Sequence, residues 1–124
     1  MATRSTIGYE TVGGGYLGVY CHYDGFPDHM GPILHRMFHV DVVILVNAAL
    51  AGGGIRCINE DGTHEIFNDG VGLDEHHRRQ RHGLVAETHW PCCPEEYAYR
   101  KCLDGRVEWT EDGESWSTWE PNVP

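Results

Sequence analysis

The sequence contains little positive charge. Its 124 residues include 9 Lys and Arg against 19 Asp and Glu, which gives a formal net charge of −10 with the nine histidines counted as neutral. A protein that binds duplex nucleic acid through its phosphates needs a basic stripe, and an anionic membrane surface attracts basic segments for the same reason. The charge balance therefore predicts that neither duplex nucleic acid nor a membrane is the direct partner.

Long apolar runs and an export signal are also missing. The longest apolar stretch, residues 42–51, is interrupted by Asn47 and has about half of the ~20 residues that a membrane-spanning helix needs. No apolar stretch follows the first six residues, so we expect no signal peptide. The cysteines number five, and an odd number without an export signal favours reduced thiols. We therefore expect a small acidic protein in the cytoplasm.

What is present favours an α+β fold in one small domain over residues 1–124. Apolar residues make up 40% of the chain, too many for a disordered acidic protein. Strands followed by a helical block and then further strands are typical of the α+β class. The expected elements are an N-terminal β-hairpin over residues 5–23, a helix over about 29–38 capped by Asp28, a segment over 40–50 that is either a second helix or a buried strand, a hairpin over 55–67, and a C-terminal antiparallel β meander over 96–119.

The second strand of the N-terminal hairpin has two distinct faces, because side chains alternate along a strand. The face expected in the core carries Leu17, Val19, Cys21 and Tyr23, and the other carries Tyr16, Gly18, Tyr20 and His22. Free cysteine behaves as a small hydrophobe. We therefore expect Cys21 to be a buried, reduced thiol.

The densest group of chemistry-bearing side chains is the run over residues 20–27, Tyr-Cys-His-Tyr-Asp-Gly-Phe-Pro, where a strand leads toward a helix. His22 and Asp24 beside three aromatic rings predict a binding site, although a turn packed between sheet and helix explains the same residues. Cys21 and His22 point to opposite faces, so they do not form a nucleophile–base pair. The candidate ligand-binding residues in this run are Tyr20, His22, Tyr23, Asp24 and Phe26.

This run resembles the YCHWDGYP signature of small, mostly uncharacterised proteins encoded by tailed bacteriophages. Further matching segments are Ile7-Gly8 upstream, residues 31–34 as Gly-x-x-Leu, residues 77–83 as a loosely similar Arg-rich stretch, and residues 96–99 with Trp109 as a C-terminal EYAY…W. The N-terminal part matches best and the middle departs from the pattern. The resemblance implies a phage origin, and it does not imply a reaction.

Arg78, Arg79 and Arg81 are the only concentrated positive charge in the chain. They belong to a segment of helical composition, where they either form a solvated face or clamp a phosphate or carboxylate, which guanidinium groups bind with two parallel hydrogen bonds. Three arginines suit a small phosphorylated ligand. They are too few to hold duplex DNA against the net charge of the chain.

The histidines and cysteines raise the question of zinc. His35 and His39 have the i, i+4 spacing with which two helical side chains share one metal ion. A second group, near one another in sequence, comprises His76, His77, His82, His89, Cys92 and Cys93. However, the chain has no Cys-x-x-Cys pair, and adjacent cysteines are poorly spaced for a tetrahedral site. We therefore expect a fold that does not depend on metal, and no cofactor.

The C-terminal meander adds a possible interaction surface. Residues 104–124 contain six acidic side chains and one arginine. Trp116 and Trp119 fall on opposite faces of the last strand, so we expect one of them to be exposed. Exposed aromatic rings among acidic side chains suit a protein interface.

Two classes of function fit these patterns. The first is a phage-encoded binding protein that counters a host antiviral defence, either by sequestering a small nucleotide signal or by occluding a host defence protein with its acidic surface. The second is a small hydrolase that uses His22 and Asp24, but no P-loop, nucleophile elbow or metalloprotease motif supports it. We therefore expect binding without catalysis. A minor virion structural protein stays open as an alternative, and so does association into a homo-oligomer.

Overall fold

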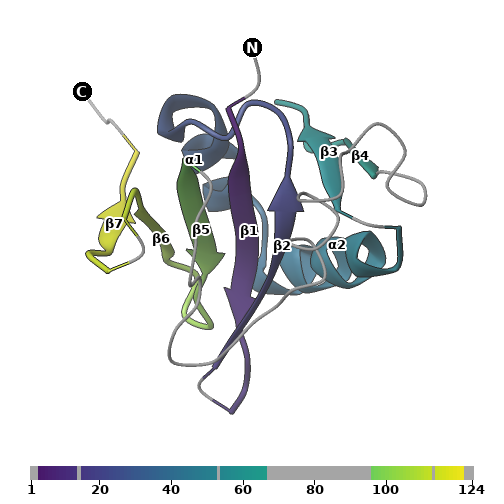
Figure 1. Cartoon of the computed structure of the whole chain (residues 1–124). Helices are drawn as coiled ribbons and strands as arrows, with labels where there is room; N and C mark the ends of the chain where they lie inside the picture. Colours follow the sequence, from purple (N-terminus) through teal and green to yellow (C-terminus); the bar gives the residue numbers. More distant parts are fainter. Residues whose placement is uncertain (1–2, 14, 53, 67–95, 113, 122–124) are drawn as a thin grey trace.

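The structure is a computed structural model. It describes residues 3–13, 15–52, 54–66, 96–112 and 114–121. Its elements are β1 (Ser5–Glu10), β2 (Tyr16–Cys21), α1 (Pro27–Arg36), α2 (His39–Gly52), β3 (Ile55–Ile58), β4 (His64–Ile66), β5 (Tyr97–Lys101), β6 (Val107–Thr110) and β7 (Ser117–Trp119). These strands form one mixed sheet in the order β4-β3-β2-β1-β5-β6-β7 (Figure 1). The α+β class, the N-terminal hairpin and the C-terminal antiparallel strands are therefore confirmed.

Strand β1 lies between β2, with which it is antiparallel, and β5, with which it is parallel. Ser5 consequently lies opposite both Cys21 and Tyr97. A second parallel pairing joins β2 to β3 through Cys21 and Ile55. The two parallel pairings bring the three predicted hairpin regions into one sheet. Neither pairing is visible in the local turn signals of the sequence.

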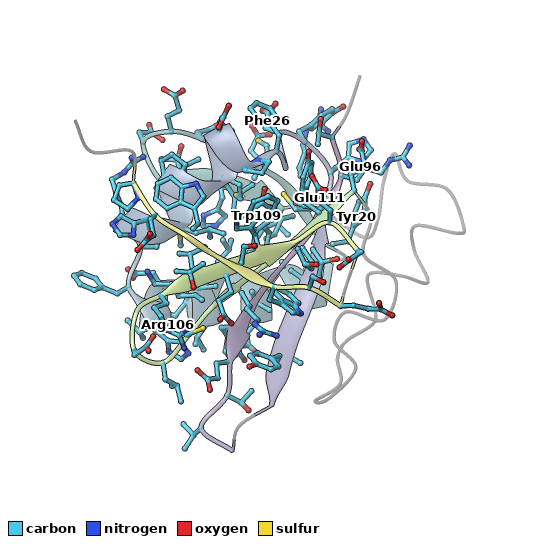
Figure 2. The ribbon with its side chains drawn as sticks, turned by 90° about the vertical axis from the view of Figure 1, so that its left-hand side faces the viewer. Tyr20, Phe26, Glu96, Arg106, Trp109 and Glu111 are labelled. Carbon is cyan, nitrogen blue, oxygen red and sulfur yellow. The ribbon has the colours of Figure 1, made fainter. Side chains whose placement is uncertain are left out.

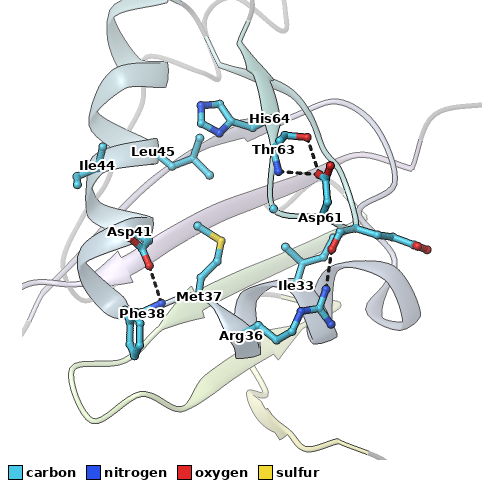
Figure 3. A pocket seen from close by; sticks show the side chains of 12 residues that line it. Ile33, Arg36, Met37, Phe38, Asp41, Ile44, Leu45, Asp61, Thr63 and His64 are labelled. Carbon is cyan, nitrogen blue, oxygen red and sulfur yellow. Dashed lines mark hydrogen bonds between the residues drawn. The ribbon is translucent and has the colours of Figure 1, made fainter.

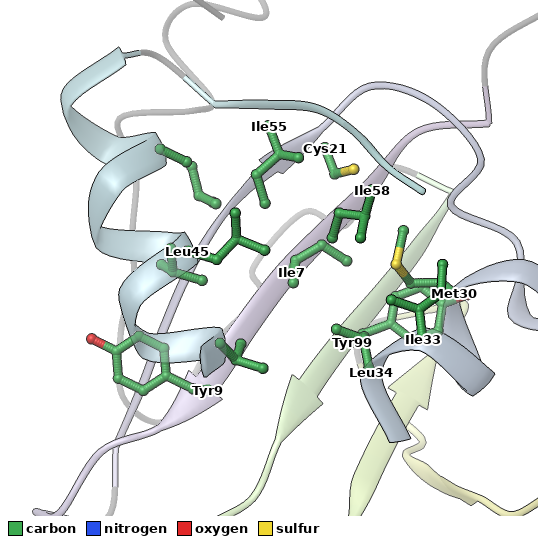
Figure 4. Packing of buried hydrophobic residues seen from close by; sticks show 14 of the residues in the cluster. Ile7, Tyr9, Cys21, Met30, Ile33, Leu34, Leu45, Ile55, Ile58 and Tyr99 are labelled. Carbon is green, nitrogen blue, oxygen red and sulfur yellow. The ribbon is translucent and has the colours of Figure 1, made fainter. Parts of the chain in front are cut away.

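The hydrophobic core lies between the sheet and the two helices, which lie behind the sheet in Figure 1. Leu45 and other inward-facing residues of α2 pack over β1 and β2, and Met30, Ile33 and Leu34 of α1 pack beside Tyr99 (Figure 4). The buried cluster comprises Ile7, Tyr9, Val19, Cys21, Met30, Ile33, Leu34, Val42, Leu45, Val46, Ala49, Ile55, Ile58, Tyr99 and Val107.

Helix α1 begins earlier than the sequence predicts. Its first residue is Pro27, and Phe26 is the N-cap without a capping hydrogen bond from its side chain. The assignment of Asp28 as the N-cap is wrong, because proline at the first helical position has the required φ and needs no partner for an N–H. Asp28 lies instead in the first turn, where a carboxylate interacts favourably with the helix dipole.

The ambiguous segment 40–50 is helical, as part of α2. Asp41 Oδ2 accepts a hydrogen bond of 3.0 Å from the Phe38 backbone N–H at the start of this helix. Val42, Leu45 and Val46 are buried at helical spacing, while Val40 and Ile44 are exposed. The apolar run therefore covers two faces of one helix, of which only one is in the core.

The chain turns between α1 and α2, and this turn separates His35 from His39. The His35 ring lies 5.4 Å from the Trp119 ring, whereas His39 Nε2 donates a 2.7 Å hydrogen bond to the Glu10 carbonyl. The expectation that these histidines share one helix is wrong, because α1 ends at Arg36. No group of three or more possible metal ligands converges within the described ranges, and residues 76–93 of the second histidine–cysteine group lie outside them.

Lys101 connects the end of α1 to the sheet. Its side chain is buried, and Nζ donates hydrogen bonds of 3.0 Å to the Leu34 carbonyl and 3.3 Å to the His35 carbonyl. A cation at a helix C-terminus satisfies carbonyls that have no partner inside the helix and complements the dipole. Burial lowers the pKa of Lys101 from its ordinary value.

Of the two helices described, neither alone has the length and apolar character needed to cross a membrane. Taken together, α1 and α2 have that length and apolar character, but the chain bends by 115° between them.

Candidate functional site

The run over residues 20–27 begins at the end of β2. Cys21 is fully buried on the core face, as predicted, and burial raises the pKa of its thiol to about 12. Tyr20, on the opposite face, is only 2% exposed, and its hydroxyl makes a 2.6 Å hydrogen bond with His22 Nδ1. Tyr23 was expected in the core but is exposed, because β2 ends at Cys21 and the alternation of side chains ends with it.

His22 and Tyr23 lie beside strand β3. Their backbone N–H groups donate to the carbonyls of Ile55 and Arg56, each at 3.0 Å. The two rings meet edge to face with centroids 4.5 Å apart. The Arg56 guanidinium lies 5.6 Å from the Tyr23 centroid, and its Nε is 3.9 Å from Glu65 Oε1. The structure therefore brings an imidazole, a phenol and a guanidinium together at the surface.

The turn that follows is packed against the N-terminal segment. Asp24 has a φ of 57°, a left-handed conformation that Asp adopts more readily than most residues. The Gly25 N–H donates to the Thr3 carbonyl at 2.9 Å, and the Gly25 carbonyl accepts a 2.6 Å hydrogen bond from the Tyr99 hydroxyl. A Cβ on Gly25 would lie 2.6 Å from the Ser5 Cβ. These contacts support the packing role of the turn.

Phe26 completes the run at the outer end of the molecule, where α1 begins (Figure 2). Its ring is 39% exposed and lies 5.8 Å from the His29 ring. His29 Nε2 in turn donates a 2.8 Å hydrogen bond to the Ile58 carbonyl. The predicted site residues of this run therefore lie one after another from the end of β2 to the start of α1. Arg78, Arg79 and Arg81 lie outside the described residues, so the predicted arginine clamp stays a prediction.

We expect Gly25→Ala to destabilise the fold by about 1–3 kcal/mol, the usual cost of forcing an extra methyl group into a packed site. The close neighbours are the Ser5 side chain and the Thr3 carbonyl, and the carbonyl is backbone that cannot move aside alone. Gly13→Ala is the control, because its Cβ would meet nothing within 4 Å. Urea unfolding followed by tryptophan fluorescence measures both. Equal stability of the two variants would contradict the close packing of the turn.

The face of the sheet that points away from the helices carries an arginine close to two aromatic rings. The Arg100 guanidinium lies 4.2 Å from the Tyr16 centroid and 3.8 Å from the Trp116 centroid, and its Nε donates a 2.7 Å hydrogen bond to Glu108 Oε1. Trp119 packs on the other side, against α1. The expectation that one of Trp116 and Trp119 is exposed is wrong, since both are half-buried. The Arg100 guanidinium is therefore held by contacts within the protein, including an ion pair with Glu108.

A groove opens between α1, α2 and the β3–β4 hairpin, away from the run over residues 20–27 (Figure 3). Its volume is about 700 Å³. The lining residues are Ile33, Arg36, Met37, Phe38, Asp41, Ile44, Leu45, Glu60, Asp61, Gly62, Thr63 and His64. Because these residues come from three segments that meet only in the fold, sequence reasoning did not identify the groove.

Negative charge lies on two walls of this groove. Asp41 belongs to α2 and Asp61 to the hairpin (Figure 3). Asp61 Oδ1 accepts hydrogen bonds from the Thr63 N–H at 2.9 Å and the Thr63 hydroxyl at 2.6 Å, and these bonds lower the pKa of Asp61. The Arg36 guanidinium donates to the Glu60 carbonyl at 2.8 Å. The groove therefore combines an apolar floor with a predominantly acidic rim.

The outer surface of α2 extends this apolar floor to the molecular surface. Phe38, just before α2, is 74% exposed, and Val40 and Ile44 are 56% and 64% exposed. Asp41 is the only charged residue among the 14 residues of α2. A helix at the surface of a globular protein normally has a polar outer face. The sequence did contain this signal, since residues 40–50 are apolar at every helical position except Asp41 and Asn47.

Comparisons with protein-family models, with curated proteins and with solved structures find no match to this chain.

Proposed function

We propose that this chain is a phage-encoded binding protein that counters a host antiviral defence by covering the surface of a host protein in the cytoplasm, without catalysis. The observation that carries the binding of a protein is the apolar outer surface of α2 with the adjoining groove. The phage origin and the counter-defence role rest on the resemblance of residues 20–27 to the phage signature.

A protein partner fits this surface better than a small phosphorylated ligand does. Protein interfaces have an apolar core and a polar rim, and contiguous exposed apolar patches on soluble proteins mark interaction sites. Phe38 and Ile44 supply the apolar part, and the carboxylates of Asp41 and Asp61 supply part of the rim. A phosphate entering the groove would meet those carboxylates, and like charges repel at close range.

The proposal is tested by the efficiency of plaquing of defence-sensitive phages on bacterial strains that each carry one defence system. We expect the wild-type chain to raise plaquing on at least one strain. Ile44→Asp should abolish this effect, because truncating a central apolar contact typically weakens an interface by about 2 kcal/mol, or roughly thirtyfold in affinity. Failure of the wild-type chain on every strain would overturn the counter-defence role.

Val12→Asp is the matched control. Val12 is 92% exposed in the β1–β2 turn, so the substitution adds the same charge at an exposed apolar position outside α2. Both variants should keep the stability of the wild type within about 0.5 kcal/mol, as is usual for surface substitutions. Equal loss of plaquing relief in both would contradict the assignment of α2 as the binding surface.

A further inference from the structure

We propose that the groove between α1, α2 and the β3–β4 hairpin binds an amphipathic helix with basic flanks, supplied by the partner protein. This inference rests on the proposed function and specifies the chemistry of the partner. It follows from the shape of the groove, from the sign of the charge on its walls, and from the exclusion of two other occupants.

The shape of the groove fits apolar anchors from a helix. Ile33 and Leu45 are buried in its floor, Met37 is partly buried, and Phe38 and Ile44 are exposed at its edge. A volume of about 700 Å³ accommodates several side chains but not a whole helix, whose diameter is about 10–12 Å. In helix-in-groove recognition, anchors at positions i, i+3 or i+4, and i+7 enter the groove while the helix body rests on its edges. The exposed surface of α2 is such an edge.

The charge on the walls selects a basic helix. The lining carries the carboxylates of Asp41, Glu60 and Asp61 against one guanidinium, that of Arg36. Asp41 and Asp61 lie on different walls (Figure 3), and within the described part of the chain neither makes an ion pair. Lysine or arginine side chains on both flanks of a bound helix would therefore meet unpaired carboxylates. Complementary charge of this kind also accelerates association.

Two other occupants are disfavoured by the same charges. A symmetric dimer would place the same surface of a second copy here, bringing Asp41 and Asp61 of both copies together, each on a chain with a net charge of −10. An anionic lipid surface would meet the same repulsion. A basic helix is the occupant that satisfies both the apolar floor and the acidic rim.

The test uses two labelled synthetic peptides of about 20 residues, a length that gives roughly five helical turns. Both peptides carry leucine along one helix face, at the spacing i, i+3, i+4 and i+7. The polar face carries lysine in the first peptide and glutamate in the second. Fluorescence anisotropy with the wild-type chain should show binding of the lysine peptide and at least tenfold weaker binding of the glutamate peptide. The affinity for the lysine peptide should fall as salt rises from about 0.05 M to 0.3 M, because screening shortens the range of the charges. Equal affinity for the two peptides would overturn the proposal.

Matched charge variants separate the groove from general attraction to an acidic protein. Asp41→Asn/Asp61→Asn keeps the acceptor oxygens used by Phe38 and Thr63 but removes two charges, and it should weaken the lysine peptide about tenfold and flatten its salt dependence. Glu111→Gln/Glu114→Gln removes the same charge from the exposed β6–β7 connection and should change the affinity less than twofold. Equal weakening by both double variants would contradict the groove as the site.

The outcome is separable from that of the proposed function. If the wild-type chain relieves a defence system and Ile44→Asp does not, while the lysine peptide fails to bind, then the partner class is wrong and the proposed function holds. If the peptide binds with the predicted variant pattern and no defence system is relieved, the helix-binding groove holds and the counter-defence role fails. Sedimentation that shows a dimer abolished by Ile44→Asp would identify a second copy as the occupant and overturn the proposal.

Discussion

Tyr99→Ala is expected to lower the free energy of unfolding by about 3–5 kcal/mol, the range for truncating a buried aromatic side chain. Tyr99 is fully buried in β5, between β1 and β6 in the sheet, and it packs beside Met30 and Leu34 of α1 (Figure 4). Its removal would leave a cavity in the interface between sheet and helix. Urea unfolding monitored by tryptophan fluorescence measures the change.

Tyr99→Phe separates the hydroxyl from the ring. The Tyr99 hydroxyl donates the 2.6 Å hydrogen bond to the Gly25 carbonyl, so its loss leaves a buried acceptor without this partner. The expected cost is about 1–3 kcal/mol, the penalty for an unsatisfied buried polar group. A Tyr99→Phe protein as stable as the wild type would show that this bond contributes nothing to holding the turn after β2.

The stability of the protein is expected to fall steeply above about pH 9 in reducing buffer. Burial raises the pKa of Cys21 from 9.0 to about 12, because the thiolate is poorly solvated in the core. Between these values the unfolded chain releases the proton and the folded chain retains it. By linkage, the free energy of unfolding then decreases by about 1.4 kcal/mol per pH unit for this one group, or about 4 kcal/mol by pH 12. Below pH 9 both states are protonated and the stabilisation is complete.

Cys21→Ala identifies the contribution of this thiol. Burial also raises the pKa of Cys102 to about 12 and raises that of Tyr99, so the wild type should lose stability faster than one group alone explains. The variant should lose about 1.4 kcal/mol less per pH unit between about pH 9 and pH 10.5. Urea unfolding across this range compares the slopes. Parallel slopes for the two proteins would mean that Cys21 ionises as readily in the folded state as in the unfolded one.

The burial of Cys21 was predictable from sequence for a simple reason. Alternation along β2 places Cys21 with Val19, and both are in the core. Tyr23 obeys the same alternation in the sequence but is exposed, because the strand ends before it. A period of two therefore predicts a face only as far as the strand continues, and the end of β2 depends on the turn at Asp24 and Gly25.

The candidate site was predicted less well than the fold. For residues 20–27 the sequence left both a binding site and a packed turn open, and their described contacts include those of a packed turn, as the bond from Tyr99 to Gly25 shows. The groove instead combines Leu45 of α2, Ile33 of α1 and Asp61 of the hairpin. Nothing in the local sequence around any of these residues indicates that the other two are close.

By itself, the sequence determined the α+β class, the hairpins and the burial of Val19 and Cys21 in β2. Each of these depends on residues a few positions apart: glycine-containing turns that reverse the chain, and alternation that directs side chains. Only the tertiary structure decided the parallel pairing of β1 with β5, the bend that separates His35 from His39, and the groove. Such contacts join segments far apart in the chain, and which of them forms depends on the total burial that the whole chain achieves rather than on local conformational preference.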